Sequence, residues 1–380
     1  MKIVIVSSYP PQADGIAVFT ADLKQALDKE MGATLPVIAV TREQSLQYGP
    51  EVCGTIRADD ADSYVQAAAA VNSQYECVLL QHEYGLFGGG GSYAGTHILE
   101  FARALTIPLV TVFHSALDHP DETKAAITSE LIDRSATVIV MSRAAQAILE
   151  RHYPNAIGKL TVIPHGVPVA LLGDKTEAKA TLDANDRYTV MTFGLLRPSK
   201  GIELGIEAIA RVVATIPDIL YWIIGREDSS TKRITGRDYL QELQKLVEDK
   251  HLSKNIRFVS RFVDEDELAQ YFSATDVYMM LHQKRDQVSS GTLARAIGNE
   301  IPIIATATPL VQELFATGGG IAVSYGNPDE IARAIIELQD PLRRQTQSSK
   351  LSEIAKTQRW PVIAREYAKL LQAIAGEPHA

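Results

Sequence analysis

The sequence has few of the features that mark secreted or membrane proteins. It contains only two cysteines in 380 residues, Cys53 and Cys77, which lack metal-site spacing and make a disulfide framework improbable. No apolar run reaches the length of about eighteen residues that a membrane helix needs. The strand-like start MKIVIVSS is too short for a secretory signal. We therefore expect a cytoplasmic protein without a transmembrane segment.

Positive charge is also scarce. The chain has 37 Lys and Arg against 46 Asp and Glu, a formal net charge of −9. Nucleic acids and anionic membranes both require a basic face, so neither is an expected partner. A three-glycine dinucleotide fingerprint is missing as well, because the first turn reads PPQADGIA and no acidic residue ends the strand at 35–40. This argues against an NAD-dependent oxidoreductase.

What the chain does have is a repeated alternation of β-branched apolar runs and segments of helical spacing. The length suits two domains, and the alternation predicts an α/β fold with parallel sheets. We expect two Rossmann-like domains that face a cleft: an N-terminal domain at 1–170, a C-terminal domain at 171–358, and a last helix within 359–380 that crosses back. The predicted strands are 2–8, 35–40, 77–81, 107–114, 136–142, 160–166, 188–194, 219–225, 256–260, 276–281, 301–306 and 320–324.

Two passages of the second half combine polar turns with helix starts. Ser289, Ser290, Gly291 and Thr292 open a predicted helix, whose positive end can hold an anion. The earlier passage FGLLRPSKGIE (193–203) brings Arg197 and Lys200 to a similar strand-to-helix turn. Two cations and a helix start that converge on one place predict a ligand that bears a diphosphate.

These passages, together with ADGIAVFT (13–20), IPHGV (163–167) and FVDEDELAQYFSATDVYMM (262–280), resemble GT-B-type retaining glycosyltransferases of family 4. The resemblance covers nearly the whole chain and rests on the order and spacing of the motifs. It implies transfer of a sugar from a nucleotide-sugar donor to an acceptor hydroxyl with retention of configuration, and no cofactor or metal. It further implies that the first domain binds the acceptor and the second the donor.

Within this resemblance Lys200 matches the family lysine, whereas the position of the family arginine is Leu195. Arg197, two residues later, is our candidate replacement. The two places of the usual glutamates hold Gln287 and Arg295. A guanidinium has donors only and cannot accept hydrogen bonds from ribose hydroxyls. Either ribose recognition differs or the usual nucleotide is not the ligand, and Asp286 is the candidate carboxylate near the sugar.

In the first half, candidate residues follow strand ends, where open α/β sheets bind ligands. His114 is expected to contact the donor sugar and, with Lys200 and Arg197, to form the catalytic set. His82 and Glu83 are assigned to the acceptor, beside a glycine-rich loop at 85–91. The remaining predicted donor-binding residues are Gly15, Asp286, Gln287, Ser289, Ser290, Gly291, Thr292 and Arg295.

Some features are left with two readings. His165 is equally compatible with a structural role and with ligand contact, while the acidic run 264–266 fits the first turn of a surface helix better than a metal site. Arg295 also favours an alternative, a glycoside phosphorylase or an enzyme that uses sugar phosphates on the same fold. The missing glutamates leave open a non-catalytic sugar-nucleotide binding module. The sugar, nucleotide, acceptor and oligomeric state are not identified by the sequence.

Overall fold

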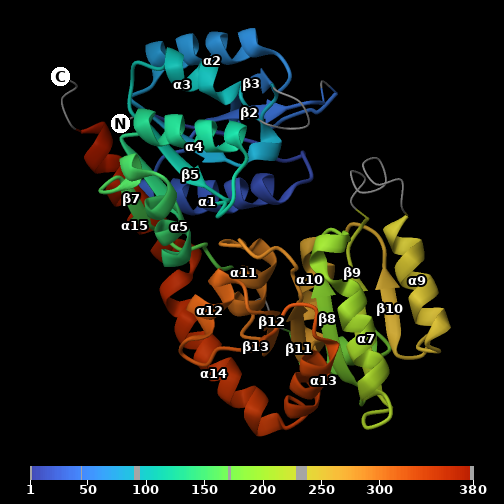
Figure 1. Ribbon diagram of the computed structural model, residues 1–380. Coiled ribbons are helices and arrows are strands. Elements are labelled where there is room, and N and C mark those ends of the chain that lie inside the picture. Colours follow the sequence, from blue (N-terminus) through green and yellow to red (C-terminus); the bar gives the residue numbers. More distant parts are fainter. Residues whose placement is uncertain (1, 44, 90–94, 170–172, 228–237, 377–380) are drawn as a thin grey trace. The chain divides into compact units, whose positions relative to one another are not determined.

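The structure is a computed structural model that describes residues 2–43, 45–89, 95–169, 173–227 and 238–376 (Figure 1). The chain divides into two units that are not simple halves. The first unit contains Met1–Gly166, Asp286–Gly291 and Trp360–Ala380, and the second contains Val167–Arg285 and Thr292–Arg359. Each unit is built around its own parallel sheet, with helices on both faces, and the two are described separately.

The first unit has a seven-stranded parallel sheet in the order β3-β2-β1-β4-β5-β6-β7. Its strands are β1 (Ile3–Ser7), β2 (Val37–Thr41), β3 (Val52–Arg57), β4 (Cys77–His82), β5 (Leu109–Phe113), β6 (Thr137–Val140) and β7 (Leu160–Val162). Its helices are α1 (Gly15–Met31), α2 (Ala61–Gln74), α3 (Ile98–Ala104), α4 (Glu122–Arg134), α5 (Arg143–His152) and α15 (Trp360–Ala375), with the short turns η1 (Tyr84–Leu86) and η2 (Pro154–Ala156).

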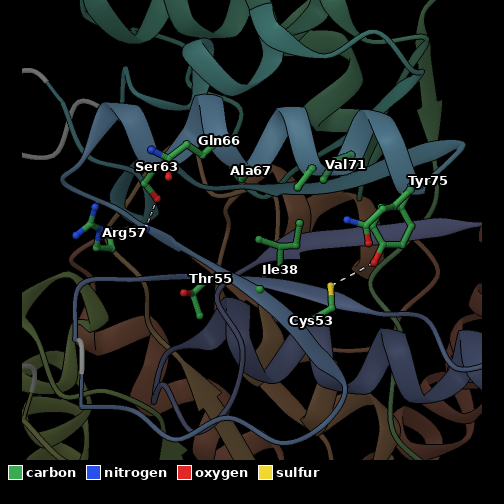
Figure 2. A pocket seen from close by; sticks show the side chains of 12 residues that line it. Ile38, Cys53, Thr55, Arg57, Ser63, Gln66, Ala67, Val71 and Tyr75 are labelled. Atoms are coloured by element: carbon green, nitrogen blue, oxygen red, sulfur yellow. Dashed lines mark hydrogen bonds between the residues drawn. The ribbon is translucent and has the colours of Figure 1, made fainter.

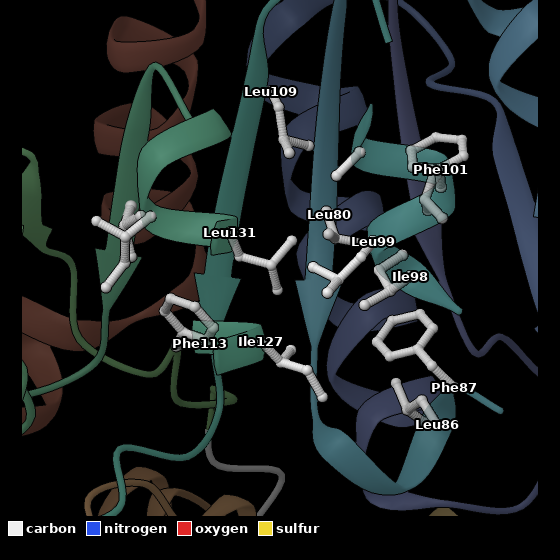
Figure 3. Close-up of a cluster of buried hydrophobic side chains, with 14 of the residues drawn as sticks. Leu80, Leu86, Phe87, Ile98, Leu99, Phe101, Leu109, Phe113, Ile127 and Leu131 are labelled. Atoms are coloured by element: carbon white, nitrogen blue, oxygen red, sulfur yellow. The ribbon is translucent and has the colours of Figure 1, made fainter. Parts of the chain in front are cut away.

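Alternation along the central strands separates two cores, one on each face of this sheet. Side chains such as Leu80 and Phe113 point to the face covered by α2, α3 and α4 (Figure 3). Their neighbours Leu79 and Val112 point to the other face, where α1 and α15 pack. Burial on both faces explains why these strands are continuously apolar rather than alternating.

Helix α15 belongs to the first unit although it lies at the end of the chain. Trp360, Ile363 and Tyr367 follow one another at helical spacing, and all three are buried in the same core as Phe19 of α1. Gly166 leaves room for Trp360, because a Cβ atom there would lie 2.2 Å from the indole ring. The last helix is therefore part of the first hydrophobic core rather than an appendage.

The second unit has a six-stranded parallel sheet in the order β10-β9-β8-β11-β12-β13. Its strands are β8 (Tyr188–Phe193), β9 (Ile219–Ile224), β10 (Ile256–Val259), β11 (Val277–Met280), β12 (Ile303–Thr306) and β13 (Ile321–Val323). Its helical segments are α6 (Lys175–Thr181), η3 (Pro198–Lys200), α7 (Ile202–Val212), α9 (Tyr239–Asp249), α10 (Glu265–Ala274), α11 (Gly291–Gly298), α12 (Pro309–Phe315), α13 (Pro328–Glu337) and α14 (Pro341–Gln358).

The α/β fold class with parallel sheets is confirmed, and every predicted strand is present. The polar stretch 170–187 contains a helix, since α6 lies within it; residues 170–172 are outside the described chain. Helix α6 is fixed by a buried carboxylate, Asp276, which pairs with Lys175 and Lys179 at 2.7 Å each. Burial alone would raise the pKa of Asp276, but the two ammonium groups outweigh it and hold the pKa at about 2.

Candidate functional site

Three residues of the second unit meet at the carboxyl end of β8 and the start of α11. A Cβ atom at Gly194 would lie 3.1 Å from Cγ2 of Thr292 and 3.6 Å from Nζ of Lys200. Gly194 has φ +125, a conformation that only glycine adopts readily, so the close approach depends on this residue type. The predicted convergence of Lys200 with the helix start at Thr292 is therefore present in the structure.

The position of Lys200 is set by the backbone on both sides of it. Pro198–Lys200 forms the turn η3, and Gly201 follows with φ +62, a left-handed conformation suited to glycine. A Cβ atom at Gly201 would lie 2.3 Å from the carbonyl oxygen of Leu281, and Gln283 N donates to Ser199 O at 2.9 Å. The turn that carries Lys200 is thus locked against the segment that follows β11.

The electrostatic setting of Lys200 favours an anion. Desolvation is the main cause that lowers its pKa to about 7, and repulsion from Arg197 and Lys284 lowers it further. No carboxylate contributes to this shift. Lys200, Arg197 and Lys284 therefore bring three cations to one region at the positive end of the α11 dipole, a setting that favours an anion. A phosphate is an anion of the kind that such a site would bind.

The segment 286–291, which precedes α11, is anchored to the first unit. Val288 is buried in the core that contains Phe113, and its carbonyl oxygen accepts a hydrogen bond from Oγ of Ser142 at 3.1 Å. Oγ of Ser289 donates to the carbonyl oxygen of His114 at 2.7 Å. Ser289 therefore contacts the backbone of a candidate catalytic residue, while Thr292, three residues later, belongs to the second unit.

The side chain of His114 lies on the α1 face of the first sheet. Its Nε2 is 2.9 Å from Oε1 of Gln81 on the neighbouring strand β4. The ring of Phe19 meets it edge-on, with centroids 4.7 Å apart, and packs in the same way against His165. Burial lowers the pKa of His114 to about 3, with smaller effects from His165 and His82. His114 is therefore a neutral imidazole at physiological pH.

His82 does not share this location. It is fully buried and stacks on Phe87 with centroids 5.6 Å apart, while Tyr84 and Phe113 meet it edge-on. His82 pairs with Phe113, so the two side chains are on the same face of the sheet. His114 is the next residue along the chain and therefore points to the opposite face. Its assignment to the acceptor is wrong in this conformation, since a ring enclosed by aromatic side chains cannot touch an acceptor.

Glu83 and Gly15 lie where strands of the first sheet end. The carboxylate of Glu83 accepts hydrogen bonds from Tyr84 N at 3.1 Å and from Oγ of Ser115 at 2.7 Å. Gly15 begins α1 behind the N-cap Asp14, and a Cβ atom there would meet nothing within 4 Å. Packing does not require a glycine at this point, so the space in front of it is open for a ligand. Of the glycine-rich loop 85–91, residues 90 and 91 lie outside the described chain.

Arg295 is engaged by a carboxylate. Its two terminal nitrogens bond the two oxygens of Glu265 at 2.6 and 2.9 Å, a bidentate pair between α11 and α10. Residues 264–266 form the cap and first turn of α10, as the sequence predicts, and Asp264 accepts from Glu267 N. Arg295 follows Thr292 by three residues, so the two share one side of α11. The carboxylate of Glu265 is thus held by a residue one helical turn beyond Thr292.

The other predicted donor-binding residues occupy the anchored segment. Asp286, Gln287 and Ser290 are half-buried, and Nε2 of Gln287 donates to the carbonyl oxygen of Ser289 at 3.1 Å. Gly291 lies close to the first core, since a Cβ atom there would be 3.6 Å from Nε2 of His165. These contacts shape the turn before α11. That Asp286, Gln287 and Ser290 contact the donor stays a prediction.

Sequence reasoning missed Gln81, Lys284 and Glu265. Gln81 is the one polar residue in the apolar stretch CVLLQ, and its polarity in a buried strand was the available signal. Lys284 follows β11 at the ligand-binding edge of a parallel sheet, where a cation merits attention. The pairing of Glu265 with Arg295 had no sequence signal, because the two residues are thirty positions apart.

A separate groove of about 430 Å³ lies between the edge strand β3 and helix α2 (Figure 2). Its walls carry Cys53, Tyr75 and Val71, and Cys53 accepts a hydrogen bond from the phenol of Tyr75 at 3.4 Å. β2 and β1 separate this edge from β4 and β5. The groove therefore shares no residue with the site around His114.

The described residues lack the features of a metal centre and of a membrane span. They contain no group of three or more His, Cys, Asp or Glu side chains arranged to hold a metal ion. None of their helices combines the length and apolar character needed to span a bilayer.

Family models match almost the entire chain. The model for "Glycosyltransferase Family 4" matches residues 13–171, and the model for "Glycosyl transferases group 1" matches residues 174–357. The boundary between the two matches falls close to the passage from the first unit to the second at Val167.

Two curated relatives are similar over part of their length. A phosphatidyl-myo-inositol mannosyltransferase of Mycolicibacterium smegmatis is 26% identical over 278 residues, which are 71% of this chain and 66% of the relative. A D-inositol 3-phosphate glycosyltransferase of Geodermatophilus obscurus is 26% identical over 227 residues, 57% of this chain and 49% of the relative. The chain thus spans just under two thirds and about half of these relatives.

Solved structures share the fold over nearly the full length. Anabaena Alr3699/HepE in complex with UDP superposes with a TM-score of 0.78 at 18% identity, covering 98% of this chain and 100% of that one. Sucrose-phosphate synthase of Thermosynechococcus elongatus gives a TM-score of 0.78 at 20% identity, with 98% and 99% coverage. At this identity the likeness establishes the arrangement of strands and helices.

Proposed function

Because the chain belongs to the GT-B glycosyltransferases of family 4, we propose that it transfers a sugar from a nucleotide diphosphate donor to an acceptor hydroxyl. The observation that carries this proposal is the meeting of Lys200, Gly194 and Thr292 at the start of α11, beside Arg197 and Lys284. Alr3699/HepE, which shares the fold, has been solved with UDP and with UDP-glucose. UDP and its sugars are therefore the first donors to test.

The chemical step that these cations assist is departure of the diphosphate. When the bond between the sugar C1 and the phosphate oxygen breaks, negative charge grows on that oxygen. Lys200, Arg197 and the α11 N-terminus stabilise this charge in the transition state more than in the ground state, which accelerates the reaction. In this proposal these cationic groups and the helix N-terminus neutralise the diphosphate leaving group in place of a metal ion.

The first unit supplies the groups for the sugar and the acceptor. His114, a neutral imidazole, is assigned to hydrogen-bond a sugar hydroxyl. Gly15 at the start of α1 has no side chain, which leaves space for the ligand next to the backbone. Glu83, fixed by Ser115, is the carboxylate that we assign to the acceptor. We further propose that the anomeric configuration is retained, as in the family.

An acidic chain with two free cysteines fits the reducing cytoplasm.

The Arg295–Glu265 pair is our candidate for ribose recognition. Arg295 occupies a place where the resembling family has a glutamate, and it cannot accept a hydrogen bond. Glu265 restores acceptors one turn beyond Thr292, on a carboxylate that is 70% exposed and held by two hydrogen bonds. Glu265→Gln should weaken UDP binding, whereas the matched change Asp266→Asn, at the next residue of the same helix turn, should not.

The two alternatives make different predictions. A sugar-phosphate enzyme was favoured by the cation Arg295, but Glu265 already neutralises that cation. Such an enzyme would be protected by sugar phosphates or inorganic phosphate and not by UDP. A non-catalytic binding module would bind a sugar nucleotide and consume none in the presence of acceptors.

A thermal-shift screen tests the proposal directly. UDP-, GDP- and ADP-linked sugars, simple sugar phosphates and inorganic phosphate would each be offered to the intact chain. A ligand at a hundred times its Kd stabilises the native state by about 2.7 kcal/mol, which is readily measured. Protection by a sugar nucleotide followed by its consumption with an acceptor supports the proposal, and protection by phosphates alone overturns it.

A further inference from the structure

Gln81 and His114 form a buried pair on the α1 face of the first sheet. Gln81 is fully buried and His114 is 7% exposed, and Oε1 of Gln81 lies 2.9 Å from Nε2 of His114. Gln81 lies on β4 opposite Val112 of β5, and His114 follows the end of β5 two residues after Val112, so both side chains are on the same face. The carbonyl oxygen of His114 is held by Ser289 at 2.7 Å, and Phe19 blocks rotation of the ring from the side.

A purely structural glutamine is hard to justify at this position. Its Nε2 is buried and has no hydrogen-bond partner among the described residues. An unpaired buried donor costs about 1–3 kcal/mol, so an apolar pair of similar shape would make the unit more stable. A contact that the chain keeps at a cost to stability is expected to act in the reaction rather than in folding.

The chemical consequence of the contact is the choice of tautomer. His114 is neutral, and a neutral imidazole has one N–H donor and one lone-pair acceptor. The oxygen of Gln81 only accepts, so the proton stays on Nε2 and the lone pair on Nδ1. The titratable groups that act on His114 are His165 and His82, and no carboxylate is among them. The tautomer is therefore set by Gln81.

We propose that Gln81 is a positioning residue that holds His114 protonated at Nε2, so that Nδ1 is the acceptor for a hydroxyl of the transferred sugar. This inference rests on the proposed function for the identity of the ligand. It makes Gln81 a determinant of how the donor sugar is oriented, although Gln81 itself is too deep to touch it. A sugar without a hydroxyl at that point would lose the interaction.

The tautomer can be read directly in the intact chain by long-range ¹H–¹⁵N correlation of ¹⁵N-labelled protein, with His114→Asn to assign the signal. We expect the Nε2–H form in the wild type. Gln81→Glu keeps an oxygen acceptor and should keep this form, whereas Gln81→Leu should give a mixture of tautomers. A wild-type His114 protonated at Nδ1, or no change in Gln81→Leu, overturns the proposal whatever the protein binds.

Kinetics then connect the tautomer to transfer. With the sugar nucleotide that protects best, Gln81→Leu should lower kcat about 10- to 100-fold, as expected when a group that orients the substrate is no longer correctly placed. Gln81→Glu should recover part of the rate, and the Kd of UDP alone should stay unchanged, because the phosphate site is on the second unit. A Gln81→Leu enzyme with wild-type kcat refutes the role.

Thr111→Val is the matched control. Oγ1 of Thr111 is buried on β5 and shares a 2.8 Å hydrogen bond with Oγ of Ser135, away from His114. This change removes a buried polar contact of the same sheet and should lower stability without altering the tautomer or kcat. If no sugar nucleotide binds at all, the proposed function fails, while the tautomer experiment still decides the role of Gln81.

Discussion

The pKa of Lys200 gives the most demanding test of the anion site. In the free protein this pKa is about 7, because burial and the cations Arg197 and Lys284 disfavour the charged form. A bound diphosphate favours the charged form and keeps the proton on. The apparent Kd for UDP should therefore be flat below about pH 6 and should rise above pH 7, approaching about tenfold, or about 1.4 kcal/mol, for each pH unit towards pH 9.

Calorimetric titration of UDP at several pH values measures this dependence. Lys200→Met should weaken UDP binding by about 2–5 kcal/mol, since it removes one partner of a half-buried, hydrogen-bonded charge pair, and should abolish the pH dependence. Lys200→Arg stays charged over the whole range and should also give a flat profile. Lys254→Met, an exposed lysine of the same unit, is the control. Wild-type affinity in Lys200→Met would refute the electrostatic argument.

Three further predictions concern other parts of the chain. Gly15→Ala should leave the free energy of unfolding unchanged or raise it by up to about 1 kcal/mol, because the position is helical and open. It should lower the rate of sugar transfer at least about tenfold, because the added methyl group blocks the ligand. A stable variant with full activity would contradict the assignment of Gly15 to the donor site. Asp276→Asn should lower the free energy of unfolding, measured in urea, by about 3 kcal/mol, because it removes the carboxylate that pairs with Lys175 and Lys179. Since the pKa of Asp276 is lowered in the folded state, the extra stability of the wild type over this variant should be present above about pH 4 and lost towards pH 2. Trp360→Ala should lower stability by about 3–5 kcal/mol, and an unchanged unfolding midpoint would show that α15 does not brace the first core.

Strands were the most predictable part of the fold. Those buried on both faces, such as β1 and β4, are continuous apolar runs with a strong signal. The edge strand β3 was missed because VCGTIR is largely exposed and contains a glycine. Helix α6 is absent from the sequence prediction, since it is held by tertiary ion pairs with Asp276 and not by an apolar stripe.

The site was predictable only where one short segment carries the chemistry. Lys200 and Thr292 could be identified because each lies in a turn that opens a helix. His82 was misplaced because period-two alternation was not applied past the strand end, and one residue of shift moves a side chain to the other face. Gln81 and Glu265 act through partners on other elements, and such pairings depend on how elements pack, which a single sequence does not specify.

The discontinuity of the first unit has a practical consequence for engineering. A chimera that exchanges the two halves at a single junction near residue 166 would separate the first sheet from α15 and from the segment 286–291. The recipient would then expose the surface that Trp360 and Tyr367 normally cover, and it would lose the hydroxyl that holds the His114 backbone. Functional hybrids of this protein must therefore transplant three stretches of chain together, and recombination libraries with one crossover should be rich in aggregating products.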